Sequence, residues 1–351
     1  YFRKTSLRLN LINHIMVKWS RLSKEVLDEA EKGLMDMAGV PVESRYIPAN
    51  DQETKLAFCL VCGEESLPPL VLLHGFLGTS IIFFKMLEPL CREYRVFCID
   101  LMGMGRSSRP FFTSVTCEEA EEFFVEPIER CRENLGIETM VLAGHSFGGY
   151  IAGCYVEKYP QNVTKLVMLS PIGVPRAPPD YNIYDRIKQM PWYARPLGKL
   201  MIYFWNKNTT MAGFLRQVGP LSGRLVKWYV KRRMTTLTEE ESELLVKYLE
   251  QVNLYPGSGE YGLTKVLKLG GWAQKPLCER LTSIPVVFMY GDRDWMDPEG
   301  AAQNVEVNEC KVIVEHVSNS GHHLYIENPQ ELCSKLLNAL KQLDQPKAAL
   351  A

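Results

Sequence analysis

The feature that most constrains this chain is a series of short apolar runs, most of them separated by stretches long enough to form helices. Each run ends in a glycine or a polar turn. Strands that are apolar on both faces and alternate with helices indicate a mostly parallel sheet covered by helices on both sides. We therefore expect an α/β fold. The predicted strands cover residues 70–73, 94–99, 140–143, 165–169, 284–290 and 312–317.

The alternation stops between about residues 174 and 270 and resumes at Ile284. An insertion in the second half of an α/β domain is the simplest explanation. We therefore expect a basic segment with a leading helix, an α/β core, and a helical cap, or lid, inserted into that core. The first part covers residues 1–44, the core covers 45–173 and 271–351, and the cap covers 174–270.

Apolar spacing and capping residues predict a helix near each end of the chain. The leading helix is expected over residues 23–38, before Gly39. The final helix follows Asn328, which suits an N-cap, and begins with Pro329, which suits the first helical position. The expected buried face of the leading helix is Val26, Ala30, Leu34 and Met37. That of the final helix is Leu332, Leu336, Leu340 and Leu343.

The composition is that of an ordinary soluble globular protein, with 46% apolar and 23% charged residues. The formal net charge of −1 predicts no overall attraction to nucleic acid. The ten cysteines are irregularly spaced, and several lie in apolar runs, which indicates reduced thiols in an intracellular compartment. Cys59 and Cys62 lack a second ligand pair, and the six histidines are scattered, so we expect no metal site.

The first 24 residues carry six basic side chains and no acidic ones, mixed with leucines, isoleucines and Trp19. This composition is typical of a membrane-surface segment or of a mitochondrial targeting peptide. The alternative is that translation begins at Met16, so that residues 1–15 are not part of the mature protein. No run of about 18 uncharged apolar residues is present, so no spanning helix is predicted.

A candidate nucleophile, Ser146, lies in the pentapeptide Gly144-His145-Ser146-Phe147-Gly148. This pentapeptide joins a predicted strand to a predicted helix. Such a sharp turn forces the serine into a strained backbone conformation, and only small residues at 144 and 148 leave room for it. The serine hydroxyl is then exposed at the carboxyl edge of the sheet. The context therefore favours a nucleophilic serine.

A serine hydroxyl needs a base held in place by a third group. In this arrangement the acid and the histidine should follow the serine in loops after later strands. His322 directly follows a glycine after the last predicted strand, and we assign it as general base. We assign Asp294, after the preceding strand, as the acid. Asp297 remains a competitor for that role, and His323 is expected to be structural.

The charge on a tetrahedral intermediate needs hydrogen-bond donors fixed in advance. The predicted strand 70–73 leads into His74-Gly75-Phe76-Leu77-Gly78, a loop that lies where a second donor should be. We expect the backbone amides of Phe76 and Phe147 to form the oxyanion hole. His74 is expected to brace the loop. The reaction then requires no metal and no organic cofactor.

The insertion is basic as well as aromatic. From residue 174 to residue 234 there are twelve lysines and arginines and two acidic residues, a balance of 12 − 2 = +10. Aromatic and cationic side chains together suit a membrane interface with anionic lipid. Lys231, Arg232 and Arg233 are candidates for binding a phosphate headgroup. The alternative is a solvated basic face.

These residues together resemble the α/β-hydrolase superfamily over most of residues 45–343. Several segments further resemble one lipid-metabolising branch, which includes the co-activator of adipose triglyceride lipase, the N-acyl phosphatidylethanolamine lipase, and fungal and plant lysophosphatidic acid acyltransferase-like phospholipases. The matching segments are Asp-Leu-Met-Gly-Met-Gly-Arg-Ser-Ser-Arg-Pro at 100–110, Pro-Gly-Ser-Gly-Glu at 256–260, Gly-Trp-Ala-Gln-Lys-Pro at 271–276, Glu279-Arg280, and the leading helix.

The resemblance implies a lipid-directed acyl-ester hydrolase. Its substrate would be a phospholipid or lysophospholipid, met at a peripheral membrane or lipid-droplet surface from the cytoplasm, with a mitochondrial location as the alternative. Plant and fungal members place their acid at the position of Asp294, and animal members at that of Asp297.

Two alternative functions follow from the same branch. One is acyl-CoA-dependent lysophosphatidic acid acyltransfer, whose signature is a histidine followed after four residues by aspartate, where this chain has Glu327. The other is a non-catalytic lipase co-activator or scaffold at lipid droplets. The co-activator has asparagine at the position of Ser146.

Overall fold

The computed structural model describes residues 22–345, and in that range the chain forms a sheet in the order β1-β2-β4-β3-β5-β6-β7-β8. β2 pairs antiparallel with both β1 and β4, and all the other neighbours are parallel. The mostly parallel sheet is therefore confirmed. The strands are β1 (Val42–Pro48), β2 (Leu56–Cys62), β3 (Pro69–Leu73), β4 (Arg95–Ile99), β5 (Met140–His145), β6 (Val163–Leu169), β7 (Val286–Gly291) and β8 (Val312–Val317).

The six predicted strands are all present, with small shifts at their ends. β7 begins at Val286 and not at residue 284, because the intervening Pro285 has no N–H group for the strand ladder. Two strands, β1 and β2, are additional to the prediction. They add the antiparallel edge of the sheet.

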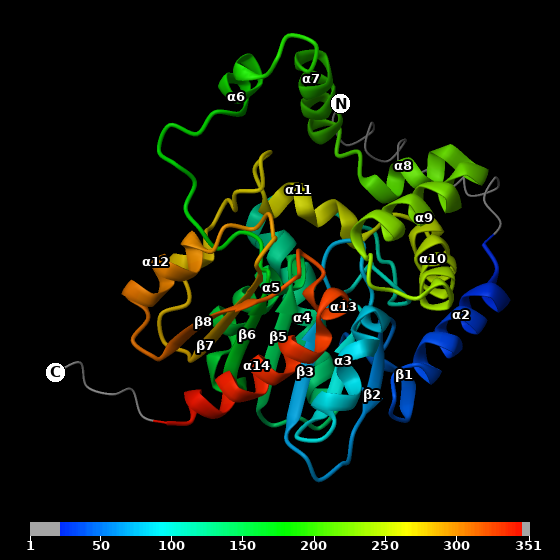
Figure 1. Cartoon of the computed structure of the whole chain (residues 1–351), viewed down its shortest axis with the longest axis vertical. Coiled ribbons are helices and arrows are strands. Elements are labelled where there is room, and N and C mark those ends of the chain that lie inside the picture. The colour runs from blue at the N-terminus through cyan, green and yellow to red at the C-terminus, as the bar shows by residue number, and fades with distance from the viewer. Residues whose placement is uncertain (1–21, 346–351) are drawn as a thin grey trace.

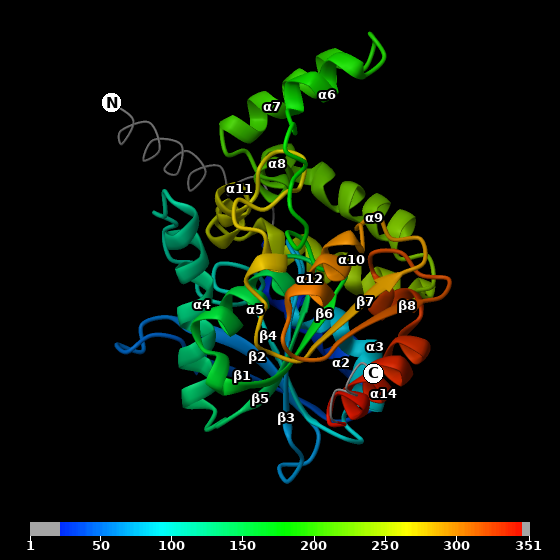
Figure 2. The same ribbon diagram turned by 90° about the vertical axis from the view of Figure 1, so that its left-hand side faces the viewer.

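Helices cover both faces of the sheet, as Figure 2 shows for α4 and α5 on one side and for α3 and α14 on the other. The sheet therefore separates two hydrophobic cores, one on each of its faces. On β3, Val71 packs with residues of α4 and α5, and Leu72 packs with residues of α2, α3 and α14. The helices that precede β6 or follow β7 are α2 (Lys24–Asp36), α3 (Phe84–Leu90), α4 (Cys117–Asn134), α5 (Phe147–Lys158), α12 (Glu299–Val307), α13 (Leu324–Glu327) and α14 (Pro329–Leu343).

Between β6 and β7 the chain forms helices and contributes no strand to the sheet. Figures 1 and 2 show α6 and α7 projecting away from the sheet, while α10 lies beside α2. The hydroxyl of Tyr248 on α10 donates to Glu31 on α2 over 3.1 Å. The division of the chain into core and cap stays a prediction. The helices are α6 (Ile183–Gln189), α7 (Arg195–Asn206), α8 (Met211–Val218), α9 (Ser222–Arg233), α10 (Glu239–Leu254) and α11 (Leu263–Val266).

The two terminal helices follow their capping residues. Ser23 caps α2, but Leu27 is buried in place of the predicted Val26 and Met37 is only partly buried, because the helix presents a slightly rotated face to its neighbours and ends before Met37. Asn328 caps α14, with its side chain accepting from the amide of Glu331, and all four predicted leucines are buried. The predictions made for the basic segment up to residue 21, Met16 included, lie outside the described residues.

Candidate active site

Ser146 lies between β5 and α5, where the chain turns sharply from strand to helix. Its backbone has φ 53° and ψ −114°, a conformation that a residue with a side chain rarely adopts. The Ser146 amide donates to the carbonyl of Leu169 at the end of β6 over 2.9 Å, which anchors the turn to the neighbouring strand. The strained turn expected from the sequence is therefore present.

Two glycines make this turn sterically feasible. A Cβ atom on Gly144 would lie 2.3 Å from the carbonyl oxygen of Gly148. A Cβ atom on Gly148 would lie 2.4 Å from the carbonyl oxygens of Leu73 and His74. Both distances are well inside van der Waals contact with backbone atoms that cannot move aside. A side chain at either position would displace the turn.

His322 joins Ser146 to Asp294. Its Nε2 lies 3.0 Å from the Ser146 Oγ, and its Nδ1 lies 3.2 Å from the Asp294 Oδ1. The three side chains come from the loops after β5, β7 and β8, which meet at the carboxyl edge of the sheet. The Trp295 ring lies 4.8 Å from the His322 ring and covers it. The structure thus brings the sequence-predicted serine, histidine and acid together, with His322 in contact with both Ser146 and Asp294.

Of the aspartates that follow β7, Asp294 is the one that contacts His322. Burial acts to raise the pKa of Asp294, but the hydrogen bond and the electrostatic interaction with His322 outweigh it and lower that pKa. Asp297 is exposed and accepts from the amide of Glu299 over 2.9 Å. Asp292 accepts from the amides that follow β8. The geometry favours Asp294 over its competitor.

The loop that carries Phe76 packs against the turn that carries Ser146. The Phe76 and Phe147 rings meet edge to face, with centroids 6.4 Å apart. Phe147 is the first residue of α5, where amides lack partners inside the helix. His74 braces the loop as expected: its Nε2 accepts from the Leu101 amide over 3.0 Å and its Nδ1 donates to the Gly75 carbonyl over 2.8 Å. The role of the Phe76 and Phe147 amides as oxyanion donors stays a prediction.

His145 holds the loop of His322, a role that sequence reasoning missed. The His145 Nε2 lies 2.9 Å from the backbone carbonyl of His322, so it donates to that oxygen. Burial holds the pKa of His145 well below its usual range, which keeps the ring neutral. Its position between Gly144 and Ser146 is the one sequence signal that could have suggested a supporting role.

His323 connects the same loop to the inserted helices. Its Nδ1 lies 2.8 Å from the hydroxyl of Tyr325, and its Nε2 lies 2.9 Å from the hydroxyl of Tyr229 on α9. Burial lowers the pKa of His323 to about 3, so the ring is neutral at physiological pH. Both ring nitrogens have partners, which fits the structural role expected for it.

Glu327 stands where the acyltransferase signature has aspartate. Its carboxylate accepts a hydrogen bond from the backbone amide of Gly321, the residue directly before His322. Glu327 therefore contacts the same loop as His145 and His323. The contact is made to the backbone and not to the imidazole.

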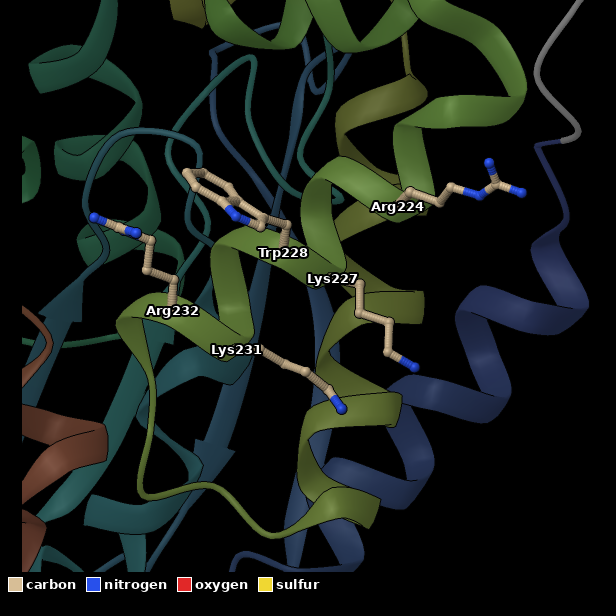
Figure 3. A pocket seen from close by; sticks show the side chains of 5 residues that line it. All are labelled: Arg224, Lys227, Trp228, Lys231 and Arg232. Carbon is tan, nitrogen blue, oxygen red and sulfur yellow. The ribbon is translucent and has the colours of Figure 1, made fainter.

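An open hollow of about 500 Å³ lies on α9 and is lined by Trp228 and basic side chains, which Figure 3 shows as sticks. Of the three candidate headgroup residues, Lys231 and Arg232 line this hollow and Arg233 is not among its lining residues, and their binding of a phosphate headgroup stays a prediction. The Arg232 guanidinium lies 5.5 Å from the Trp228 ring centre, and the Lys231 ammonium pairs with Glu239 over 3.0 Å. The other lining residues are Arg224 and Lys227.

Within residues 22–345, no cluster of histidine, cysteine, aspartate or glutamate side chains has the makeup of a metal site. Over the same range, no helix combines the length and the apolar character needed to span a membrane.

Comparison with known proteins gives the same fold and identifies relatives within one branch of the family. The family model described as alpha/beta hydrolase fold matches residues 68–329, well over half of the chain. The membrane phospholipase A described as a bacterial virulence factor superposes with a TM-score of 0.65 at 20% identity, over 92% of each chain. The carboxylesterase CesB of Bacillus subtilis superposes with a TM-score of 0.62 at 20% identity, over 90% of this chain and 96% of its own.

Curated relatives are more similar in sequence. The 1-acylglycerol-3-phosphate O-acyltransferase of Arabidopsis thaliana is 31% identical over 93% of this chain and 82% of its own length. The protein named 1-acylglycerol-3-phosphate O-acyltransferase ABHD5 of Homo sapiens is 33% identical over 79% and 78%. The (lyso)-N-acylphosphatidylethanolamine lipase of Mus musculus is 29% identical over 84% and 87%. The chain therefore belongs to the α/β-hydrolase family, in the lipid-metabolising branch that contains these acyltransferases and this lipase.

Proposed function

We propose that this protein is a serine hydrolase that cleaves acyl esters of glycerophospholipids or lysophospholipids. The observation that carries the proposal is the continuous contact from the Ser146 hydroxyl through His322 to Asp294. A hydroxyl within 3.0 Å of an imidazole whose other nitrogen faces a carboxylate is the arrangement that activates serine.

The proposed reaction has two steps. Ser146 Oγ attacks the ester carbonyl while His322 Nε2 takes its proton, and the negative oxygen is stabilised by the Phe76 and Phe147 amides. The ester C–O bond then breaks, and the alcohol leaves with the proton from His322, as a lysolipid when the substrate is a phospholipid and as a glycerophosphate ester when it is a lysophospholipid. In the second step His322 takes a proton from water, hydroxide attacks the acyl-enzyme, and the fatty acid leaves as Ser146 recovers its proton. Asp294 stabilises the imidazolium formed in each step.

The inserted helices support a lipid substrate. Their exposed side chains are aromatic and basic: Trp192 is 79% exposed and Trp228 is 61% exposed. Indole rings at headgroup level and cations facing anionic lipid are typical of a protein that binds a membrane surface. We propose that residues 174–270 form a cap that docks on such a surface, either a peripheral membrane or a lipid droplet.

Within that cap, α9 is the proposed headgroup site. It carries five basic residues and no acidic ones. Because Lys231 is already paired with Glu239, the guanidinium of Arg224 and the ammonium of Lys227 are the cations more available to a phosphate. Figure 3 shows the Lys227 and Lys231 side chains extending in the same direction from α9, on the opposite side from Trp228.

A second candidate function is acyl transfer to lysophosphatidic acid. The names of relatives that are 31% and 33% identical favour it. The chemistry differs only in the acceptor: acyl-CoA would acylate Ser146, and the free hydroxyl of lysophosphatidic acid would replace water in the second step. Glu327 departs from the signature, and its carboxylate contacts the Gly321 backbone in place of a reacting group.

Two assays on the purified full chain separate these functions. In one, vesicles carry a phospholipid with a labelled acyl chain, and free fatty acid is measured. In the other, labelled acyl-CoA and lysophosphatidic acid are supplied, and phosphatidic acid and free fatty acid are measured together. We expect fatty acid release in both assays. Phosphatidic acid formation that outpaces fatty acid release would instead establish the acyltransferase.

The Ser146→Ala variant is the control for both assays, and it should lose both products. Full retention of the cellular function by Ser146→Ala, with no product formed by the wild type, would favour a non-catalytic scaffold.

A further inference from the structure

Two cysteines lie side by side on the face of the sheet covered by α3. Cys62 is the last residue of β2, and Cys91 is the C-cap of α3. Their Sγ atoms are 3.1 Å apart, and both are free thiols. A disulfide bond of about 2.05 Å requires the two sulfurs to approach by only about 1 Å.

The two thiols differ in exposure. Cys91 is partly exposed at the end of its helix, whereas Cys62 is 4% exposed. The hydrogen-bonded contact between the two sulfurs lowers the pKa of Cys91, while the same contact and burial raise the pKa of Cys62. Cys91 is therefore the sulfur that a small oxidant reaches first, and Cys62 is placed to react with the product.

We propose that Cys62 and Cys91 form a dithiol that a hydroperoxide oxidises to a disulfide. The Cys91 thiolate attacks one peroxide oxygen, the O–O bond breaks, and Cys91 becomes a sulfenic acid as hydroxide leaves. The Cys62 sulfur then attacks the Cys91 sulfur, the S–O bond breaks, and water leaves. In total two thiols and one hydrogen peroxide give one disulfide and two waters. This inference is independent of the proposed lipid substrate.

The bond would close the segment between residues 62 and 91, which contains β3, the His74–Gly78 loop and α3. Cross-linking a folded segment at a contact already present stabilises the protein mainly by restricting the unfolded chain. The oxidised protein should therefore unfold at a higher temperature. Ser146 and His322 lie at the carboxyl edge of the sheet and are not moved, so ester hydrolysis should be retained.

The test uses the full chain treated with hydrogen peroxide and then mapped by mass spectrometry after alkylation. We expect a peptide pair joined through Cys62 and Cys91, the loss of two of the ten thiols, and a Tm that rises by several degrees and returns after reduction. In Cys62→Ser the joined peptides should be absent, and the Cys91 sulfenic acid should become trappable with dimedone. Cys117→Ser, which removes another partly exposed cysteine, should behave as the wild type does.

Two results would overturn the proposal. One is direct over-oxidation of Cys91 to the sulfinic acid in the wild type, with no joined peptide. The other is a joined peptide that contains Cys91 and any cysteine other than Cys62. Because both are read on the wild-type protein, the test stands even if Cys62→Ser fails to fold.

Discussion

At the scale of single residues, the candidate site depends on which carboxylate faces His322. Asp294 is buried and contacts the imidazole, whereas Asp297 is exposed and contacts the start of α12. A carboxylate that contacts Nδ1 fixes the tautomer in which Nε2 accepts the serine proton. The two aspartates form a matched pair, since each can be changed to asparagine with the same loss of charge.

We predict that Asp294→Asn lowers kcat for a soluble ester by roughly 10⁴-fold, the size of effect seen when a triad acid is neutralised. Asp297→Asn should leave kcat within about twofold, because it changes one hydrogen bond outside the site. Steady-state kinetics on both purified variants checks this. A larger loss in Asp297→Asn than in Asp294→Asn would move the acid to position 297.

At the scale of elements, α9 links the helices inserted between β6 and β7 to the candidate site. One side of this helix carries Tyr229, whose hydroxyl contacts His323, and another side carries the basic hollow of Figure 3. His323 directly follows His322, so a shift of α9 would reach the loop of His322 through the side-chain contact between Tyr229 and His323. If the inserted helices bind a surface as proposed, this contact would couple that binding to the position of His322.

We predict that Tyr229→Phe lowers the free energy of unfolding by about 1 kcal/mol through the lost hydrogen bond. It should also lower kcat several-fold with little change in KM, because the His322 loop loses a support without losing a substrate contact. Tyr193→Phe, on an exposed tyrosine of the same insertion, is the control. Denaturant unfolding and kinetics on a soluble ester measure both effects. Equal behaviour of the two variants would contradict the link.

The basic side of α9 leads to a separate prediction, which concerns binding to anionic membrane surfaces. Reversing two cations, Arg224→Glu with Lys227→Glu, should weaken binding to anionic vesicles by about tenfold or more, since each cation near such a surface contributes about 1 kcal/mol. Arg92→Glu with Lys311→Glu makes the same charge change in the segments that lead into β4 and β8, at the amino edge of the parallel strands. Vesicle sedimentation of both variants checks the prediction. Similar losses in both would mean that net charge, and not α9, governs binding.

At the scale of the whole molecule, the parts of the fold that can be predicted from the sequence are the elements that have a local apolar pattern. Strands β3 to β8 were predictable because each is a short apolar run. β2 carries the same signal in its buried residues 57–62, while β1 is a largely exposed edge strand with little apolar pattern to read. The His145 contact with the His322 backbone joins residues 177 positions apart, and no local pattern encodes it.

Buried neutral histidines make stability depend on pH. Burial lowers the pKa of His74, His145 and His323 below the ordinary value near 6.5, to about 3 for His323. Below pH 6.5 the unfolded chain therefore binds protons that the folded chain does not bind. The free energy of unfolding should fall as pH falls from 6.5 toward 3, by up to about 1.4 kcal/mol per pH unit for each histidine.

Urea unfolding at pH 7 and at pH 5 checks this dependence. His323→Gln should show a smaller difference between the two pH values than the wild type, even if it is less stable at both. An unchanged pH dependence in that variant would show that His323 is not buried as a neutral ring.

The most direct test of the central claim is to look for the acyl group on Ser146. The full chain is mixed with a labelled phospholipid, quenched in acid within one turnover, and digested for mass spectrometry. The account predicts an acyl ester on the peptide that contains Ser146, its absence in Ser146→Ala, and its accumulation in Asp294→Asn if that change slows deacylation more than acylation. Fatty acid release by Ser146→Ala at the wild-type rate, or an acyl group on any other residue of a fully active protein, would contradict it.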